Sequence, residues 1–245
     1  RSSDLDRLLK APSKQRGRDF AIMLTAFNNL GYSVEWRVIN AADYGRSQRR
    51  RRVFFFVFRN DTKYAKSLDS KYENEDIVFE EHKYDDYLFQ TGLFATQFPI
   101  KQAPVKNRQV FYELEDDIVA VSDNFTGTVW NTGVMRHGKY YSIETAANFD
   151  GNPITLGEIL QDETEVPDKY FLTDKAKLEK FQYLRGPKKL ERTSADGHTY
   201  IYSEGGMSPY DDLNLPGRTM LTSEGTVNRS THFLFVNNKY RLLTP

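Results

Sequence analysis

The sequence contains no cysteine, and histidine, with 4 residues, and tryptophan, with 2, are scarce. Without cysteine the chain can form no disulfide, no thiolate metal site and no cysteine nucleophile. The histidines lie far apart, without an H-x-x-x-H pair or the companion-carboxylate spacing of a metal site, so we expect no bound metal. No apolar run approaches the roughly 18 residues that cross a bilayer, so we expect no membrane partner and no signal peptide. The first residue is not methionine, and we expect a processed or truncated chain.

Charge is balanced over the whole chain but not along it. The formal net charge is zero, from 34 basic and 34 acidic residues. Residues 1–60, however, hold 13 Arg and Lys against 5 Asp and Glu, whereas residues 61–100 hold 4 against 9. A basic segment followed by an acidic one predicts two structural units, of which only the first is suited to phosphate groups.

The clearest structural pattern lies in the first quarter of the chain. Apolar residues recur at helical spacing from Phe20 to Leu30, and Gly31 follows at the position of a helix C-terminal cap. Residues 32–39 alternate between apolar and polar side chains, which predicts a half-buried strand. Residues 53–58 are apolar without alternation, which predicts a central strand buried on both faces. The predicted order is helix, strand, basic turn, strand.

The rest of the chain is less periodic. Short alternating runs at 110–114 and 118–121 predict brief strands. Residues 155–160 begin with a capping box, a threonine followed three residues later by a glutamate, and predict a short helix. Another helix is predicted from Asp174, or the threonine before it, toward Tyr183, and the Gly-Pro pair beyond it ends that helix.

The run Gln48-Arg49-Arg50-Arg51-Arg52 leads directly into the apolar strand. On an extended chain alternate side chains point the same way, so Gln48, Arg50 and Arg52 are expected to share one face. The planar guanidinium of arginine suits phosphates and base edges because it donates two parallel hydrogen bonds. The pattern therefore predicts a rigid row that binds anions or bases. A solvated basic turn is the alternative interpretation.

Together with its flanks, this run resembles the Q-x-R-x-R motif of DNA cytosine-C5 methyltransferases. Tyr44-Gly45 precedes it and Val53-Phe54 follows it, and in that family the motif lies between two strands of the catalytic domain. The resemblance implies that Arg52 contacts the flipped cytosine and supports the active site. It also implies that Arg50 binds the DNA backbone or orders the catalytic loop, and that Gln48 braces the turn.

Two segments near the C-terminus resemble further motifs of the same family. The sequence PGRTMLTSEG at 216–225 is similar to the family's ninth motif, an R-T-x-x-T segment that helps to hold the recognition region. In this chain its residues are Arg218, Thr219 and Thr222. The sequence RLLTP at 241–245 is similar to the start of the final motif. Each piece alone is equally typical of an ordinary strand and turn, but both follow the Q-x-R-x-R run in the family's order.

The resemblance places residues 61–215 in the position of the variable target recognition domain. The polar, glycine-containing stretch 192–208 resembles a base-reading loop, because glycine allows close backbone approach and polar side chains bond base edges. A mobile surface loop is the alternative interpretation. The residues of this stretch that we expect to contact DNA are Arg192, Thr193, Ser194, His198 and Ser203.

The parts of the family pattern that the sequence lacks define its expected role. The family adds a cysteine to C6 of an extruded cytosine, bonds N3 with a glutamate, and transfers a methyl group from S-adenosylmethionine. This chain has no Pro-Cys pair and no glycine-rich loop for the methyl donor. It has Ser3-Asp4-Leu5 where the family has Glu-Asn-Val before an Asp-Arg pair. Arg50 and Arg52 are then supporting catalytic residues, and the chain alone is expected to be inactive.

We therefore interpret the chain as the C-terminal portion of a bacterial or phage DNA cytosine-C5 methyltransferase. The expected fold is α/β, with part of a Rossmann-like, S-adenosylmethionine-dependent methyltransferase core at 1–60 and 216–245 and a mixed α+β target recognition domain at 61–215. We expect a monomer of the bacterial cytoplasm, associated with the nucleoid, that binds duplex DNA, recognises a short sequence and holds the flipped cytosine. S-adenosylmethionine is expected only in the full-length enzyme, and the missing catalytic half is a possible partner. The alternatives are a stand-alone, inactive DNA-binding protein and one subunit of a split methyltransferase.

Overall fold

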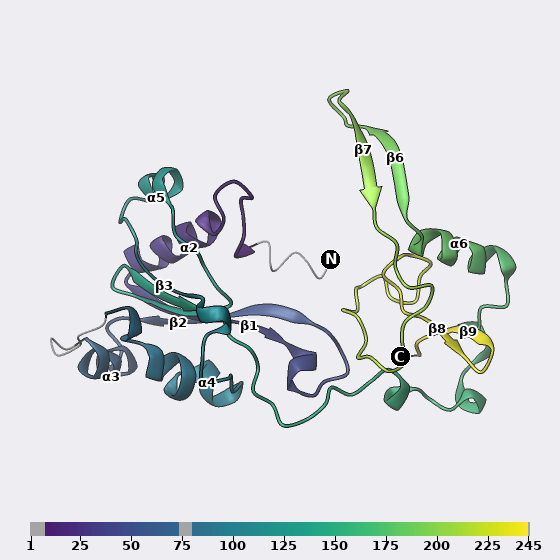
Figure 1. Ribbon diagram of the computed structural model, residues 1–245, viewed down its shortest axis with the longest axis horizontal. Coiled ribbons are helices and arrows are strands. Elements are labelled where there is room, and N and C mark those ends of the chain that lie inside the picture. The colour runs from purple at the N-terminus through teal and green to yellow at the C-terminus, as the bar shows by residue number, and fades with distance from the viewer. Residues whose placement is uncertain (1–7, 74–79, 245) are drawn as a thin grey trace. The chain divides into compact units, whose positions relative to one another are not determined.

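The computed structural model describes residues 8–73 and 80–244 and divides the chain into two compact units (Figure 1). The first comprises Arg1–Gly45 and Arg50–Asn152, and the second comprises Arg46–Arg49 and Pro153–Pro245. The predicted recognition domain, residues 61–215, has its residues 61–152 in the first unit and 153–215 in the second. Which segments recognise DNA stays a prediction.

The first unit is a five-stranded antiparallel sheet with helices, within the described residues. The strand order is β2-β1-β4-β5-β3. One apolar cluster, around Phe20 and Trp36, includes residues of α2 and α5, and a second, around Leu68 and Tyr84, includes residues of α3. The mixed α/β class is therefore confirmed. Its helices and strands are α2 (Arg18–Asn29), β1 (Tyr32–Asn40), β2 (Arg51–Arg59), α3 (Lys63–Tyr72), a π-helical turn (Tyr87–Thr91), α4 (Leu93–Gln97), β3 (Gln109–Glu113), α5 (Ile118–Asn124), β4 (Thr132–Arg136) and β5 (Lys139–Ile143).

The two predicted strands of this unit are both present, but β1 is the more buried strand and β2 lies at the edge of the sheet. β1, predicted to be half-buried, pairs with β2 on one side and β4 on the other; six of its 9 residues are buried and the others are partly buried. β2, predicted to be central, lies at the edge of the sheet, and no other described strand pairs with its outer side. Both faces of β2 carry apolar side chains, but only Phe58 is fully buried and Phe54 is 47% exposed.

The strand predicted at 32–39 is confirmed as β1, but its predicted half-burial was wrong because polar side chains on it are buried with hydrogen-bond partners. Glu35 is fully buried and accepts hydrogen bonds from the Tyr87 hydroxyl at 2.9 Å and the Phe94 amide at 3.2 Å. Burial raises the pKa of Glu35, although these hydrogen bonds oppose the rise. Arg37 donates to the carbonyl oxygens of Leu88 and Phe98, at 2.7 and 2.9 Å. A pattern that equates polar with exposed cannot detect such satisfied positions.

Of the other elements predicted in the first unit, two are confirmed and one is wrong. The helix ending near Leu30 is confirmed as α2, and the run at 110–114 is confirmed as β3. The strand predicted at 118–121 is wrong, because these residues form the start of helix α5. Asp117 caps that helix by accepting a hydrogen bond from the Val119 amide at 2.9 Å. The cap favours the helix over the β-branched alternation that suggested a strand.

The second unit contains one helix, two separate β-hairpins and several single turns of 3₁₀ helix, within the described residues. Asp174 caps α6, as predicted, by accepting from the Ala176 amide at 2.8 Å. The predicted capping box is also confirmed: Thr155 donates its amide to Glu158 at 2.7 Å, ahead of a 3₁₀ turn. A small core forms around Phe181, Phe233 and Leu242. The helix and strands are α6 (Lys175–Arg185), β6 (Lys188–Thr193), β7 (Thr199–Glu204), β8 (Phe233–Val236) and β9 (Lys239–Leu242). In the described part of the chain, no helix is both long and apolar enough to cross a bilayer.

Gly133 in β4 allows the Trp36 side chain to pack against the sheet. A β-carbon at this position would lie 2.6 Å from the carbonyl oxygen of Tyr141 and closer still to the Trp36 ring. Because Trp36 is fully buried, we expect Gly133→Ala to lower the free energy of unfolding of the first unit by about 3 kcal/mol or more. Tryptophan fluorescence measures this directly, since both tryptophans of the chain lie in the first unit.

The matched control is Gly205→Ala. A β-carbon there meets no atom within 4 Å, so the fluorescence transition should not move. An unchanged transition in Gly133→Ala as well would contradict the packing at this position.

Candidate nucleic-acid interface

The two motifs that the sequence singled out separately are joined in the second unit. Gln48 forms a parallel β-bridge with Gly217. The Arg49 amide donates to the Gly217 carbonyl, and the Gly217 amide donates to the Ser47 carbonyl, both at 2.7 Å. The hydroxyl of Thr219 donates to the Arg49 carbonyl at 2.8 Å. The start of the Q-x-R-x-R run is therefore a short strand held by the R-T-x-x-T segment, a contact between residues about 170 positions apart.

Gly217 favours this close approach. A β-carbon at Gly217 would lie 3.2 Å from Nε2 of His232 and 3.3 Å from the Ser47 carbonyl oxygen. Glycine therefore removes the atom that would separate the two backbone segments. Gln48 lies between the two residues whose backbone groups bond to Gly217, and the bracing role that the resemblance implies for it stays a prediction.

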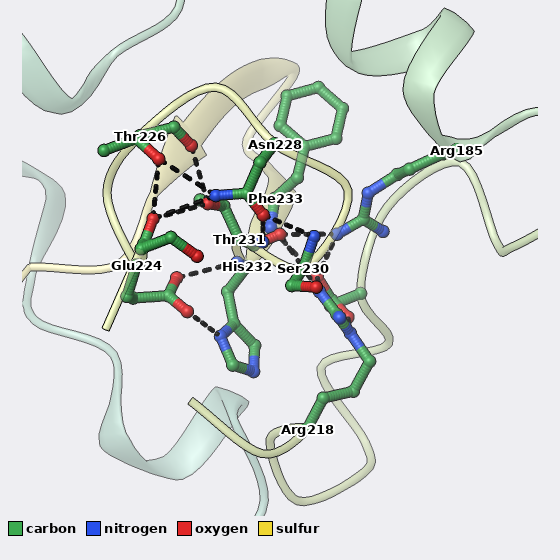
Figure 2. A network of polar contacts seen from close by, with 11 residues as sticks. Arg185, Arg218, Glu224, Thr226, Asn228, Ser230, Thr231, His232 and Phe233 are labelled. Atoms are coloured by element: carbon green, nitrogen blue, oxygen red, sulfur yellow. Dashed lines mark hydrogen bonds and ion pairs between the residues drawn. The ribbon is translucent and has the colours of Figure 1, made fainter. Parts of the chain in front are cut away.

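Arg218 belongs to a buried ionic network (Figure 2). Its Nε donates to Asp211 at 2.6 Å, and the guanidinium of Arg185, at the end of α6, donates to the other oxygen of Asp211 at 2.6 Å. Both arginines also donate to the Thr231 carbonyl at 3.0 Å, and the Phe233 amide donates to Asp211 at 2.9 Å. Arg218 thus has strong intramolecular partners, and the expected contact of this side chain with DNA stays a prediction.

The network determines the charge state of Asp211, which is 7% exposed. Burial on its own would raise the pKa of this carboxyl group. The hydrogen bonds from Arg218 and the Phe233 amide, with the charges of both arginines, instead lower the pKa to about 2. Asp211 is therefore an anion at neutral pH, and its charge offsets the repulsion between the guanidinium groups of Arg185 and Arg218.

The loop after the R-T-x-x-T segment is closed by its own polar side chains (Figure 2). Glu224 accepts from the amide of His232 at 2.7 Å and lies 3.1 Å from its Nδ1. Asn228 accepts from the Ser230 amide at 2.7 Å, and the Thr231 hydroxyl donates to the Thr226 carbonyl at 2.6 Å. Thr222 is exposed at the beginning of this loop. Its expected role toward DNA is not tested by these contacts.

Arg50 and Arg52 belong to the first unit, so the unit boundary divides the predicted row of Gln48, Arg50 and Arg52. Arg52 is opposite Ile39 in the β1–β2 pair and donates to the Arg51 carbonyl at 2.7 Å. Partial burial lowers the pKa of Arg52, and the neighbouring charge of Arg50 lowers it further. Mutual repulsion of this kind is relieved when an anion binds.

The stretch predicted as a base-reading loop is instead a β-hairpin, which we call the β6–β7 ribbon (residues 188–204) (Figure 1). Directly opposite residues of an antiparallel pair share a face. One face therefore carries Arg192 with Tyr200 and Tyr202, and the Arg192 guanidinium lies 3.9 Å from the Tyr202 ring centroid. The other face carries Thr193 and Ser203. The five predicted residues are thus brought onto one ribbon, but on different faces and in the turn.

Hydrogen bonds close the turn of the ribbon and anchor its base. The Ser194 amide donates to the His198 carbonyl at 2.8 Å, and Gly197 adopts a positive φ of 83°. At the base, Lys188 donates to the Leu184 carbonyl at 2.8 Å, and Arg229 pairs with Glu204 at 2.9 Å. The ribbon therefore extends as a firmly attached two-stranded element.

Sequence reasoning missed the exposed apolar residues of the ribbon. Ile201 is 61% exposed and Tyr200 is 42% exposed. The alternation of residues 199–204 was a usable signal for the second strand, but the polar composition suggested a loop. An isolated two-stranded ribbon buries little apolar surface by itself, which favours a ligand-contacting role.

Two sequence predictions have no structural description. Ser3-Asp4-Leu5 and Asp6-Arg7, which the resemblance aligns with the catalytic glutamate motif, lie outside the described residues. Among the described residues, no group of three or more His, Asp or Glu side chains is arranged to hold a metal ion.

Comparison with known proteins decides the family. The model of the C-5 cytosine-specific DNA methylase family matches residues 8–245 of the sequence. The chain belongs to this family. Among curated members of it, the type II methyltransferase M.Sau3AI of Staphylococcus aureus is 51% identical over 242 residues, which cover 99% of this chain and 55% of that protein.

Other methyltransferases match shorter parts of the chain. M.MthTI of Methanothermobacter thermautotrophicus is 36% identical over 64 residues, 24% of this chain and 19% of that protein. M.HhaI of Haemophilus parahaemolyticus is 39% identical over 49 residues, 20% of this chain and 15% of that protein. The chain spans about half the length of the methyltransferase that it matches from end to end. No solved structure matches it.

Proposed function

We propose that this chain is the DNA-reading portion of a DNA cytosine-C5 methyltransferase. It binds duplex DNA, reads a short target sequence and holds the extruded cytosine for methyl transfer from S-adenosylmethionine. The whole enzyme performs the chemistry, and this chain supplies positioning and recognition. The predicted division into a partial catalytic core and a recognition domain becomes, in this proposal, a core contribution from the first unit and recognition by the second.

The observation that best supports the proposal is the pairing of residues 47–49 with the backbone of Gly217 and the hydroxyl of Thr219. This pairing attaches the second unit to the chain just before Arg50 and Arg52. In this proposal the second unit recognises the sequence, and Arg50 and Arg52 contact the flipped base. Their direct connection along the chain links recognition of the sequence to binding of the base. Neither motif has this consequence by itself.

Each part has a physical role in the proposed reaction. The β6–β7 ribbon enters a groove of the duplex, where Arg192, Thr193 and the turn residues donate to base edges. Arg52, and Arg50 beside it, donate to the flipped cytosine and the adjoining phosphates. Unstacking a base costs a few kcal/mol, and these charge-assisted hydrogen bonds offset that cost.

S-adenosylmethionine supplies the electrophilic methyl group when it is bound. Among the described residues, the cleft of about 750 Å³ in the first unit does not fit that cofactor, because it is lined by Lys10, Lys14, Arg16, Arg51 and Arg108. Such a lining repels the positively charged sulfonium and attracts anions. The cofactor and the nucleophilic cysteine are therefore supplied by a part of the enzyme outside this sequence.

The outer edge of β2 supports this division of labour. No described strand pairs with this edge of β2, and the side chain of Phe54 in β2 is 47% exposed. Exposed apolar sheet edges favour pairing with a further strand. We assign that strand to the portion of the methyltransferase that carries the cysteine.

The proposal is tested by replacing Arg50 and Arg52 with alanine in an enzyme that joins this chain to its cysteine-bearing portion. We expect methylation to fall roughly a hundredfold or more, because preorganised donors at the reacting base are lost. Arg59→Ala is the matched control, since Arg59 is at the other end of β2 and pairs with Asp61 at 2.5 Å. Methylation that survives the Arg50 and Arg52 exchange at the control level would overturn the proposal.

A further inference from the structure

The β6–β7 ribbon carries an arginine whose guanidinium packs against an aromatic ring. Tyr202 is on the strand that faces Arg192, two residues beyond its direct partner Tyr200. Such diagonal neighbours share a face of the ribbon and come within reach when one side chain is long. The Arg192 guanidinium lies 3.9 Å from the Tyr202 ring centroid, a distance at which the ring face attracts a cation. The contact restricts a side chain that would otherwise sample many rotamers.

This contact leaves the hydrogen-bonding edge of Arg192 available. A guanidinium that lies over a ring uses its face for the contact, and it donates hydrogen bonds in its own plane. Among the described residues, no carbonyl or carboxylate oxygen accepts a hydrogen bond from the Arg192 side chain, and the residue is exposed. Arg192 therefore offers a planar pair of donors from a restricted position.

Arg185 shows the other use of such a ring contact. In the described residues of the second unit, it is the one other arginine that lies over an aromatic ring, 5.5 Å from the Phe233 centroid. Its guanidinium is buried, and its terminal nitrogens donate to Asp211 and to the Thr231 carbonyl. The ring contact of Arg185 therefore supports the interior, whereas that of Arg192 supports a side chain on an exposed ribbon (Figure 1).

The hydroxyl groups near Arg192 are less able to choose among bases. A hydroxyl both donates and accepts, so serine and threonine bond to more than one kind of base edge. The Ser194 hydroxyl is also engaged within the turn, where it donates to the His198 carbonyl at 3.0 Å. The arginine fork, by contrast, matches the O6 and N7 acceptors that guanine presents in the major groove, which admits a two-stranded ribbon.

We propose that Arg192 reads a guanine of the target sequence in the major groove, and that Tyr202 is the residue that positions its guanidinium. This inference rests on the proposed function and names the base and the side chains by which the ribbon selects its target. The Tyr202 ring supports one face of the guanidinium, so that both donors meet O6 and N7 together. A donor pair restricted in advance loses less conformational entropy on binding than a mobile one.

The test is the selection of duplexes from a random pool, at physiological salt, by the 245-residue chain and its variants Arg192→Ala, Tyr202→Leu and Tyr202→Phe. The wild type should enrich a sequence with a strongly preferred guanine. In Arg192→Ala the preference at that position should fall roughly tenfold or more, while other positions keep theirs. Tyr202→Leu should weaken the preference at the same position, and Tyr202→Phe, which retains the ring, should restore it.

A modified base tests the contact at the level of single atoms. 7-Deazaguanine at the preferred position lacks the N7 acceptor, so it should lower the affinity of the wild type roughly tenfold and leave that of Arg192→Ala unchanged. Tyr183→Leu is the matched control. Its ring also contacts a cation, Lys188 at 5.1 Å, but at the base of the ribbon, and Tyr183 is 62% exposed. This variant should select the same sequence as the wild type.

Failure of the inference can be distinguished from failure of the proposed function. A wild-type chain that enriches no sequence would overturn both. A wild-type preference that Arg192→Ala leaves unchanged, or an affinity that it lowers equally for every sequence, would overturn guanine reading alone. Tyr202→Leu that selects as the wild type does would overturn the positioning role of Tyr202.

Discussion

Replacing Asp211 by alanine is expected to unfold the second unit while the first remains folded. The change leaves Arg185, which is 1% exposed, and Arg218 facing each other without their shared carboxylate, and it removes the acceptor of the Phe233 amide. Breaking a buried ionic network by removing one member costs about 3–5 kcal/mol. Amide hydrogen exchange in residues 175–242 should rise strongly, whereas tryptophan fluorescence, which reports on the first unit, should be unchanged.

The matched control is Lys239→Ala. Lys239 pairs with Glu163 on the surface of the same unit, and its side chain is 59% exposed. Exposed ion pairs contribute at most about 1 kcal/mol, so exchange in this variant should resemble the wild type. Equal exchange in Asp211→Ala and Lys239→Ala would contradict the central position of Asp211.

The same carboxylate gives the second unit an acid-dependent stability. The pKa of Asp211 is lowered from 3.8 to about 2, so its stabilisation is complete above pH 4 and is lost as the pH falls toward 2. At roughly 1.4 kcal/mol for each pKa unit, the stabilisation lost is about 2 kcal/mol. The Asp211→Ala variant should lack this component of the acid transition.

Shortening the β6–β7 ribbon is expected to abolish sequence preference without unfolding the chain. Replacing residues 192–200 by an Asn-Gly turn keeps Glu191 opposite Ile201 and removes the whole tip, including Arg192 and His198. The anchors at the ribbon base, Lys188 and Glu204, remain. Because each good base contact discriminates by about 1–3 kcal/mol, losing two of them should reduce the preference for the target sequence by about a hundredfold.

Binding that persists in this variant should be sequence-blind and sensitive to salt, since phosphate contacts remain. Lys175→Ala at the start of α6 serves as the control, because its side chain is 89% exposed and lies outside the ribbon. A shortened ribbon that still selects the wild-type sequence would show that recognition resides elsewhere.

The local elements were predictable where short-range chemistry dominates. Helix α6 follows from the Asp174 cap, and the 3₁₀ turn near Glu158 follows from its capping box. Position in the sheet was not predictable in the same way. β1 was placed too near the surface because Glu35 and Arg37 find partners from residues more than 50 positions away, which no periodicity reveals.

In the candidate site, too, the local motifs were predictable from the sequence, whereas the contacts between distant residues were not. The resemblance located the Gln48–Arg52 run and the segment around Thr219, but not that their backbones pair across about 170 residues. The sequence also offered no sign that Arg218 shares a buried carboxylate with Arg185. The two faces of the β6–β7 ribbon became visible only with its register, which assigns Arg192 and Thr193 to opposite sides.

The central claim is that this chain recognises a short DNA sequence. Its most direct test is the selection of duplexes bound by the chain from a random pool, at low and at physiological salt, followed by sequencing of the bound fraction. We expect a short cytosine-containing sequence to be enriched and to remain enriched at physiological salt. Binding that is blind to sequence and vanishes as salt rises would contradict the claim and reduce the chain to a nonspecific phosphate-binding protein.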